Sequence, residues 1–311
     1  MTDLILHHYP QSPFAEKARL MLGFKGLSWH SVMIPPVMPK PDLTALTGGY
    51  RRTPVLQIGA DIYCDTALIA RRLEQEKSGP ALFPEGQEAA AAGLAQLADQ
   101  VLFQHAVAIN FQPQGLAERF AGMPEQVIKA FVADRQKLFT GGTASRLDTD
   151  VALSQWPALL SRLELQLERD GDFLLGEHPS IADFAHYHAL WFVASNRAVA
   201  AALEPYPAVR AWMQRVADFG HGSHTDMSGE QAITIARESA PAPLPAGAIA
   251  SPGGFEVGQA VTVSAVDYGT DEVAGTLVFE GEEEIIIARD DERAGLVHVH
   301  FPRFGFRIRA A

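Results

Sequence analysis

The stretch YPQSPFAEKAR, residues 9–19, decides the fold. It follows a short apolar run at 4–9 that predicts a strand, and its prolines end that strand. Ser12 followed by Pro13 is typical of a helix start, because serine is favoured as the N-cap and proline at the first helical position. Apolar residues then recur at helical spacing up to Gly23. The stretch therefore predicts a strand, a tight turn and a helix.

The chain that follows this helix completes one small α/β unit. It contains short apolar runs separated by turn residues, and then a helix that opens at an Asp-Thr pair. We expect an α/β domain at 1–80. Its predicted order is strand, helix, strand, loop, strand, strand and helix, at 4–9, 12–23, 29–34, 35–52, 53–58, 62–64 and 65–77.

From residue 84 the pattern changes to helical repeats. Apolar residues recur at helical spacing, and no strand pattern interrupts 86–239, which predicts an all-α domain at 84–240. A Pro/Gly-rich linker follows at 241–254, and after it the apolar period becomes two. We expect a small all-β barrel or sandwich-like module at 255–311, with strands near 261–265, 276–279, 284–288, 296–301 and 306–309.

Composition and charge exclude several classes of protein. The 311 residues carry a formal net charge of −12, whereas binders of nucleic acid and of anionic membranes need basic surface. A single cysteine, Cys64, excludes a disulfide within the chain and a cysteine-based zinc site. We find neither a signal-peptide pattern nor an apolar run of about 18 residues. We therefore expect a soluble, cytoplasmic protein that binds neither nucleic acid nor membrane.

The hydroxyl at the start of the first helix is the first group that suits chemistry. Ser12 would lie beside unpaired backbone N–H groups and the positive end of the helix dipole, which together stabilise an anion such as a thiolate. Lowering a thiol pKa from about 8.5 to about 6.5 requires roughly 2.7 kcal/mol of preferential stabilisation of the anion. One hydrogen bond and a helix end can supply this energy. The alternative is that Ser12 only caps the helix.

Two later motifs suit an extended, charged ligand. Thr53-Pro54 opens a strand, and a cis peptide bond there would leave the backbone of Val55 free to pair with a peptide. The alternative is an ordinary strand-edge proline. Asp65-Thr66 opens a helix, where the hydroxyl and free N–H groups suit a carboxylate and Asp65 suits an ammonium group. The alternative is that Asp65 is an N-cap.

Taken together, four patterns over residues 4–220 resemble the cytosolic glutathione transferases of the serine type. They are YPQSPFAEKAR at 9–19, RTPVL at 52–56, DTALIA at 65–70 and PSIADFA at 179–185. In the last of these, Ser180 and Asp183 have the spacing of a capping box, so this motif concerns folding. The resemblance implies a thioredoxin-like, glutathione-binding domain at 1–80, then the helical domain, and a homodimer. The β-module is not part of the usual family architecture.

The resemblance also implies roles for single residues. Ser12 would hydrogen-bond the sulfur of glutathione, with Tyr9 as a competing partner. The second substrate, a small apolar electrophile, would lie between Pro10, Phe14 and a helix at 102–111. Conjugation, isomerisation and peroxide reduction share the same first step, so the sequence does not separate them. The residues expected to bind glutathione are Arg52, Thr53, Pro54, Val55, Asp65 and Thr66, with Arg52 directed at the glycine carboxylate.

Three other functions would need different residues or surfaces. Thioredoxin-like oxidoreductases carry Cys-Pro-x-Cys where this chain has SPFA at 12–15, so dithiol exchange is excluded. A non-catalytic scaffold that acts on another protein through 255–311 is the main alternative. A metal enzyme would need a third ligand beside a histidine pair, and we expect no metal. The pairs are His7/His8, His186/His188, His221/His224 and His298/His300.

Overall fold

The computed structural model describes residues 3–144, 146–169, 171–249 and 251–311. The N-terminal α/β unit has the predicted order of elements with one addition. Its elements are β1 (Leu4–His8), α1 (Pro13–Phe24), β2 (Trp29–Met33), α2 (Pro41–Thr47), β3 (Val55–Ile58), β4 (Asp61–Cys64) and α3 (Thr66–Glu76).

The addition is α2, which lies in a stretch that we expected to be a loop, and that expectation was wrong. Pro41 stands in the first turn of α2, where the missing N–H of proline breaks no intrahelical bond. Leu43 and Leu46 are buried on its inner face. Gly48, with a φ of 76°, ends the helix in the left-handed conformation that glycine adopts without a steric penalty.

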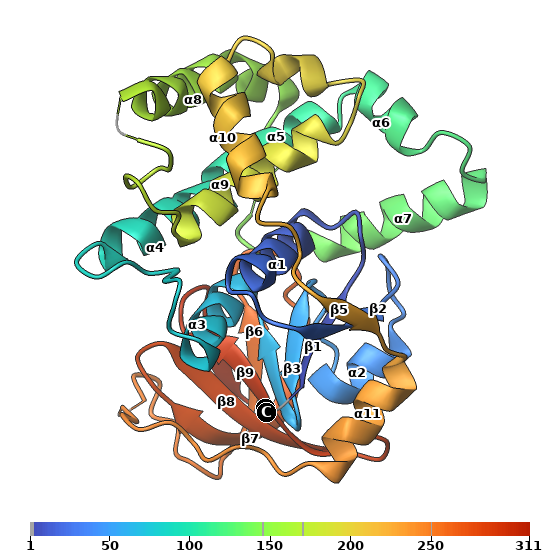
Figure 1. The fold of residues 1–311 in the computed structure, drawn as a ribbon. Helices are drawn as coiled ribbons and strands as arrows, with labels where there is room; N and C mark the ends of the chain where they lie inside the picture. Colours follow the sequence, from blue (N-terminus) through green and yellow to red (C-terminus); the bar gives the residue numbers. More distant parts are fainter. Residues whose placement is uncertain (1–2, 145, 170, 250) are drawn as a thin grey trace.

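The first four strands have two faces with different coverings. β1 pairs in parallel with β2 and antiparallel with β3, and β3 pairs antiparallel with β4. Because successive side chains of a strand point to opposite faces, Leu4 and Leu6 share a core with α1, α3 and the helical region. Ile5 instead belongs to a second core with α2 and the C-terminal strands. In Figure 1, α1 and the helical region lie above β1, and α2 and the C-terminal strands β7 (Val273–Glu280) and β8 (Glu284–Asp291) lie below it.

The helical region follows, as the sequence predicts. None of the helices in the described ranges has both the length and the hydropathy to cross a membrane. The elements are α4 (Glu88–Leu97), the π-helix η1 (Ala98–Leu102), α5 (Phe103–Asn110), α6 (Pro113–Arg119), α7 (Glu125–Leu138), α8 (Thr149–Arg169), α9 (Ile181–Ala194), the 3-10 helix η2 (Ala200–Leu203), α10 (Pro207–Ala217) and α11 (Gly229–Glu238).

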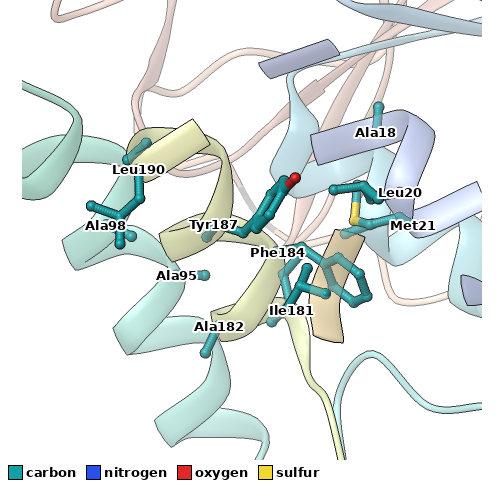
Figure 2. Close-up of a cluster of buried hydrophobic side chains, with 14 of the residues drawn as sticks. Ala18, Leu20, Met21, Ala95, Ala98, Ile181, Ala182, Phe184, Tyr187 and Leu190 are labelled. Carbon is teal, nitrogen blue, oxygen red and sulfur yellow. The ribbon is translucent and has the colours of Figure 1, made fainter. Parts of the chain in front are cut away.

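Helix α9 is the centre of the first core. It is buried along most of its length and packs against α1, α4, α5 and α10. Figure 2 shows Phe184 and Ile181 of α9 near Met21 and Leu20 of α1, with Ala95 of α4 on the other side. The predicted capping box is present at its start, where Ser180 and Asp183 bond each other's backbone N–H groups. The α/β unit and the helical region therefore share one core.

A short strand, β5 (His224–Asp226), interrupts the stretch that we expected to be free of strands, so that expectation was wrong. It pairs in parallel with β2 through His224, Thr225 and Asp226. All three residues are exposed, so no alternation of apolar and polar residues marks them. Pairing with a sheet edge thus creates this strand without an apolar pattern.

All five predicted C-terminal strands are present. β6 to β10 pair antiparallel with their neighbours, and β9 pairs in parallel with β4 of the first unit. The module therefore continues the first sheet, giving one ten-stranded sheet in the order β10-β6-β7-β8-β9-β4-β3-β1-β2-β5. The strands are β6 (Ala260–Ala265), β7 (Val273–Glu280), β8 (Glu284–Asp291), β9 (Gly295–Pro302) and β10 (Phe306–Ala310).

A buried histidine joins β9 to the first unit. The Nε2 atom of His300 lies 3.0 Å from Oδ1 of Asp61 on β4, and its Nδ1 atom lies 3.0 Å from Oε2 of Glu284 on β8. The ring stacks on Tyr63, with 4.3 Å between ring centroids. Burial lowers the pKa of His300, but the two carboxylates outweigh it, so that the pKa lies above its ordinary value.

We expect this histidine to make stability depend on pH. Because the folded chain holds the His300 proton more tightly, the contribution is complete below the ordinary imidazole pKa of about 6.5 and is lost as the pH rises through the raised value. His300→Gln should lower the melting temperature by about 2–4 °C near pH 5.5 and by less near pH 8.5. Calorimetry of both proteins isolates this group, since the other buried histidines are common to both. A difference that is independent of pH would contradict the assignment.

Candidate functional site

Residues from the three predicted motifs of the first unit meet at one small hollow of about 20 Å³. Phe14 comes from α1, the 52–54 segment leads into β3, and Asp65 and Thr66 open α3. Tyr50 and Tyr268 also line the hollow, and sequence reasoning missed both. The complete lining is Phe14, Tyr50, Arg52, Thr53, Pro54, Asp65, Thr66 and Tyr268.

Ser12 is the N-cap of α1, and its catalytic role stays a prediction. Its Oγ atom accepts a hydrogen bond from the N–H of Ala15 at 3.2 Å, and its side chain is buried. Among the described residues, the hydroxyl of Ser12 accepts this hydrogen bond and has no acceptor for its own hydrogen. Ser12 is not among the residues that line the hollow.

Arg19 holds the loop before Ser12 in place. Its Nη2 atom donates to the carbonyl oxygen of Pro10 at 3.0 Å, and its Nη1 atom donates to that of Tyr9 at 3.4 Å. Nη1 also donates to Nδ1 of His8 at 3.0 Å, which requires a neutral imidazole acceptor. Burial, aided by the positive charge of Arg19, lowers the pKa of His8 to about 3. One guanidinium thus bonds to three consecutive residues, His8, Tyr9 and Pro10.

Tyr9, the alternative sulfur partner, is half-buried and packs against the second core. Its carbonyl oxygen accepts a hydrogen bond from the N–H of Ser12 at 3.2 Å. Tyr9 is also absent from the lining of the hollow. Its backbone therefore shapes the turn that presents Ser12.

The Thr53–Pro54 peptide bond is cis, as the motif suggests. Val55, however, lies inside β3 and is in register with His7 on one side and Cys64 on the other. Because strands flank it on both sides, its backbone is not free, which corrects our expectation for Val55. Thr53 and Pro54 precede the strand and line the hollow, and of these two only Thr53 has a backbone N–H group.

Asp65 has an unusual backbone conformation at the start of α3. Its φ of 74° is left-handed, which is rare for a residue other than glycine and is found mostly at constrained sites. Its Oδ1 atom accepts a hydrogen bond from the N–H of Ala67 at 3.0 Å, so Asp65 is the N-cap of α3. Its Oδ2 atom lies 3.5 Å from Nη1 of Arg52. Thr66 follows directly and is buried.

Arg52 joins the hollow to the C-terminal strands. Its Nη2 atom is paired with Oδ1 of Asp267 and donates to the carbonyl oxygen of Tyr268 at 2.6 Å. The guanidinium also lies 4.0 Å from the centroid of the Tyr268 ring. No sequence motif marks Asp267 or Tyr268, because they lie in a turn more than two hundred positions from Arg52.

The apolar side of the site lies between α1 and the helical region. The ring of Phe14 contacts Phe103 of α5 at 4.7 Å and His188 of α9 at 4.6 Å between centroids. Lys17, which is fully buried, pairs its Nζ atom with Oδ2 of Asp99 at 2.7 Å behind this surface. Pro10 is exposed. Phe14 therefore contacts α5 directly, and the second-substrate pocket expected between them stays a prediction.

The surroundings of the histidine pairs and of Cys64 differ from those of a metal site or of a nucleophile. Among the residues that the structure describes, no three His, Cys, Asp or Glu side chains are grouped as metal ligands would be. The rings of His298 and His300 lie 6.5 Å apart, and His300 is held by carboxylates of two strands. Cys64 is buried, and burial raises the pKa of its thiol, which favours packing over nucleophilic chemistry.

An α/β unit of this order, followed by helices that share its core, is the architecture that the resemblance implies. Family models agree: that of the glutathione S-transferase N-terminal domain matches residues 6–81, and that of the C-terminal domain matches 126–218. A crystal structure of a GST-like protein from Pseudomonas syringae is 53% identical over 100% of both chains, with a TM-score of 0.85. The chain therefore belongs to the glutathione S-transferase family.

More distant solved structures share the fold. A glutathione S-transferase from Rhodospirillum rubrum is 19% identical over 69% of this chain and 87% of its own, with a TM-score of 0.53. Glutathione S-transferase I, solved with lactoylglutathione, is 17% identical over 70% and 99%, with a TM-score of 0.51. No curated protein matches the chain. The two family models end before the C-terminal strands β6 to β10 begin.

Proposed function

We propose that this protein binds glutathione at the hollow, ionises its thiol and transfers the sulfur to a small apolar electrophile. The observation that carries the proposal is the meeting of three motifs that are separate in the sequence. Phe14 follows Ser12 in the first motif, and 52–54 and 65–66 supply the remaining lining.

The chemistry of the lining suggests how the tripeptide lies. The hydroxyl of Thr66 and the N–H groups at the start of α3 suit the γ-glutamyl carboxylate, and the carboxylate of Asp65 suits its ammonium group. The backbone of Thr53, which is outside the strand, suits the cysteinyl unit. Arg52, whose guanidinium also lines the hollow, suits the glycine carboxylate.

The reaction would begin when the bound thiol loses its proton to solvent. The hydroxyl of Ser12 then donates a hydrogen bond to the sulfur anion, beside the N-terminus of α1. The sulfur electron pair forms a bond to the electrophilic carbon while a leaving group departs or a double bond accepts a proton. Pro10, Phe14 and Phe103 offer the apolar surface for that substrate.

Calorimetric titration with glutathione and a conjugation assay test this proposal. Thr66→Val removes the hydroxyl but keeps the shape and the β-branched character, so glutathione should bind about tenfold more weakly because one charge-assisted hydrogen bond is lost. Thr234→Val on α11 is the matched control, because the hydroxyl of Thr234 lies outside the hollow and donates to the carbonyl oxygen of Glu230 in its own helix. Equal affinity of Thr66→Val and wild type, or no heat of binding at all, would contradict the proposal.

The alternative function, a non-catalytic scaffold acting through β6 to β10, is favoured by one observation. Asp267 and Tyr268 of the C-terminal region already contact Arg52 and leave little open volume. Retention on immobilised glutathione separates the two functions, since a scaffold that has lost the site would not be retained.

We also propose that the protein is a cytoplasmic homodimer with a role in detoxification. Light scattering in solution tests whether it is a dimer.

A further inference from the structure

The segment 266–272, between β6 and β7, closes one side of the hollow. It is fixed to the helical region by backbone hydrogen bonds, from the N–H of Gly269 to the oxygen of Leu138 at 2.6 Å and from the N–H of Ala144 to the oxygen of Asp267 at 3.0 Å. The ring of Tyr268 also stacks on Phe139, with 5.3 Å between centroids. The C-terminal region thus contributes a fixed wall to the site of the first unit.

This segment places two carboxylates on the arginines beside the hollow. Asp267 pairs with Arg52, and Oδ2 of Asp271 lies 3.6 Å from Nη1 of Arg51. Arg51 is buried and also pairs with Asp134 of α7 at 2.7 Å. An entering carboxylate would meet guanidinium groups that already have anionic partners.

Lys40, the third cation near the hollow, also has hydrogen-bond partners within the chain. The Nζ atom of Lys40 donates to the hydroxyl of Thr53 at 2.9 Å and to the carbonyl oxygen of Arg51 at 3.2 Å. Burial lowers the pKa of Lys40 to about 8, which weakens it further as a fixed positive charge. Three cations lie near Thr53 among the described residues, and each already has an acceptor from the chain itself. They are Lys40, Arg51 and Arg52.

We propose that Asp267 occupies the place of a ligand carboxylate on Arg52 and so determines which thiol the site prefers. The inference rests on the proposed function and makes it more specific. The site would take γ-glutamyl thiols whose far end is uncharged at least as well as glutathione, whose glycine carboxylate competes with Asp267 for one guanidinium. Segment 266–272 is then a specificity element supplied by the C-terminal strands.

A comparison of two ligands on the wild-type protein tests this without any substitution. The probes are glutathione and its monoethyl ester at the glycine carboxyl, which differ by that one charge. We expect the ester to bind as tightly as glutathione, within about twofold, because Arg52 is already paired. If the ester binds about tenfold more weakly than glutathione, the glycine carboxylate uses a free cation and the proposal is wrong.

The isosteric variant Asp267→Asn tests the same claim from the side of the protein. It removes the competing charge, so glutathione should bind about tenfold more tightly while the affinity for the ester changes by less than about twofold. Asp290→Asn is the matched control, because Asp290 is an exposed aspartate on β8 with the same change of charge. Melting temperatures of both variants show whether the segment keeps its place.

The outcomes separate this inference from the function on which it rests. If both ligands bind but Asp267→Asn shifts the two affinities equally, or shifts neither, the role of Asp267 is wrong and the thiol site stands. If neither ligand binds wild type or variant, the proposed function fails and the inference fails with it. Tighter binding of glutathione by Asp290→Asn to the same extent would also overturn the proposal, since the effect would then be one of net charge.

Discussion

Replacing Asp183 by alanine should lower the free energy of unfolding by about 3–5 kcal/mol, the largest effect on stability that we expect. The Asp183 carboxylate is fully buried and accepts hydrogen bonds from the backbone N–H groups of Ser180 and Leu174. It also accepts from Nε1 of Trp212 at 2.9 Å. Alanine would leave these donors unpaired at the centre of the core that α1 and the helical region share.

Urea unfolding followed by circular dichroism measures this loss, and the chain offers a matched control. The capping box at the start of α11 has the same spacing, with Ser228 and Gln231, but it is exposed. Gln231→Ala should therefore cost only about 1 kcal/mol, because water satisfies the freed N–H. Equal losses of unfolding free energy for Asp183→Ala and Gln231→Ala would show that burial does not determine how much a capping box stabilises the protein.

Replacing Ser12 by alanine should lower kcat/KM for conjugation by about 10- to 100-fold. The reason is the loss of one hydrogen bond to a sulfur anion, which is worth about 1.5–3 kcal/mol. Because the hydroxyl of Ser12 caps α1 through the N–H of Ala15, the variant will also be less stable by about 1 kcal/mol. The rate must therefore be measured well below the melting temperature of the variant.

Two further variants assign this effect. Ser12→Thr keeps a hydroxyl at the N-cap and should retain most of the activity. Tyr9→Phe should leave the rate within about twofold of wild type, because Tyr9 does not line the hollow and accepts the bond from Ser12 through its carbonyl oxygen. A large loss of rate in Tyr9→Phe together with an unchanged rate in Ser12→Ala would show that Tyr9, and not Ser12, donates the hydrogen bond to the sulfur.

The fold was predictable wherever local chemistry and tertiary packing agree. Ser12-Pro13 and Ser180 with Asp183 mark helix starts through their own side chains, so these starts follow from the sequence. Helix α2 was missed because the prolines at 35–41 are typical of a loop, although Pro41 lies in the first turn of the helix. Strand β5 was missed because pairing with β2, rather than any apolar pattern, creates it.

The candidate site was predictable only on the side of the first unit. Arg52, Asp65 and Thr66 belong to local motifs, and the structure brings them to one hollow. Asp267 and Tyr268 were not predictable, because they reach Arg52 only when β9 pairs with β4 and the C-terminal strands continue the first sheet. Such a contact depends on docking between distant segments and leaves no signal in a single sequence.

The most direct test of the account is the pKa of the glutathione thiol when it is bound to the protein, followed by ultraviolet titration of the thiolate. We expect the bound thiol to have a pKa at least about one unit below that of the free thiol, and Ser12→Ala to return it toward the free value. Saturable binding of glutathione with an unchanged thiol pKa would contradict it, because this site would then hold the tripeptide without activating its sulfur.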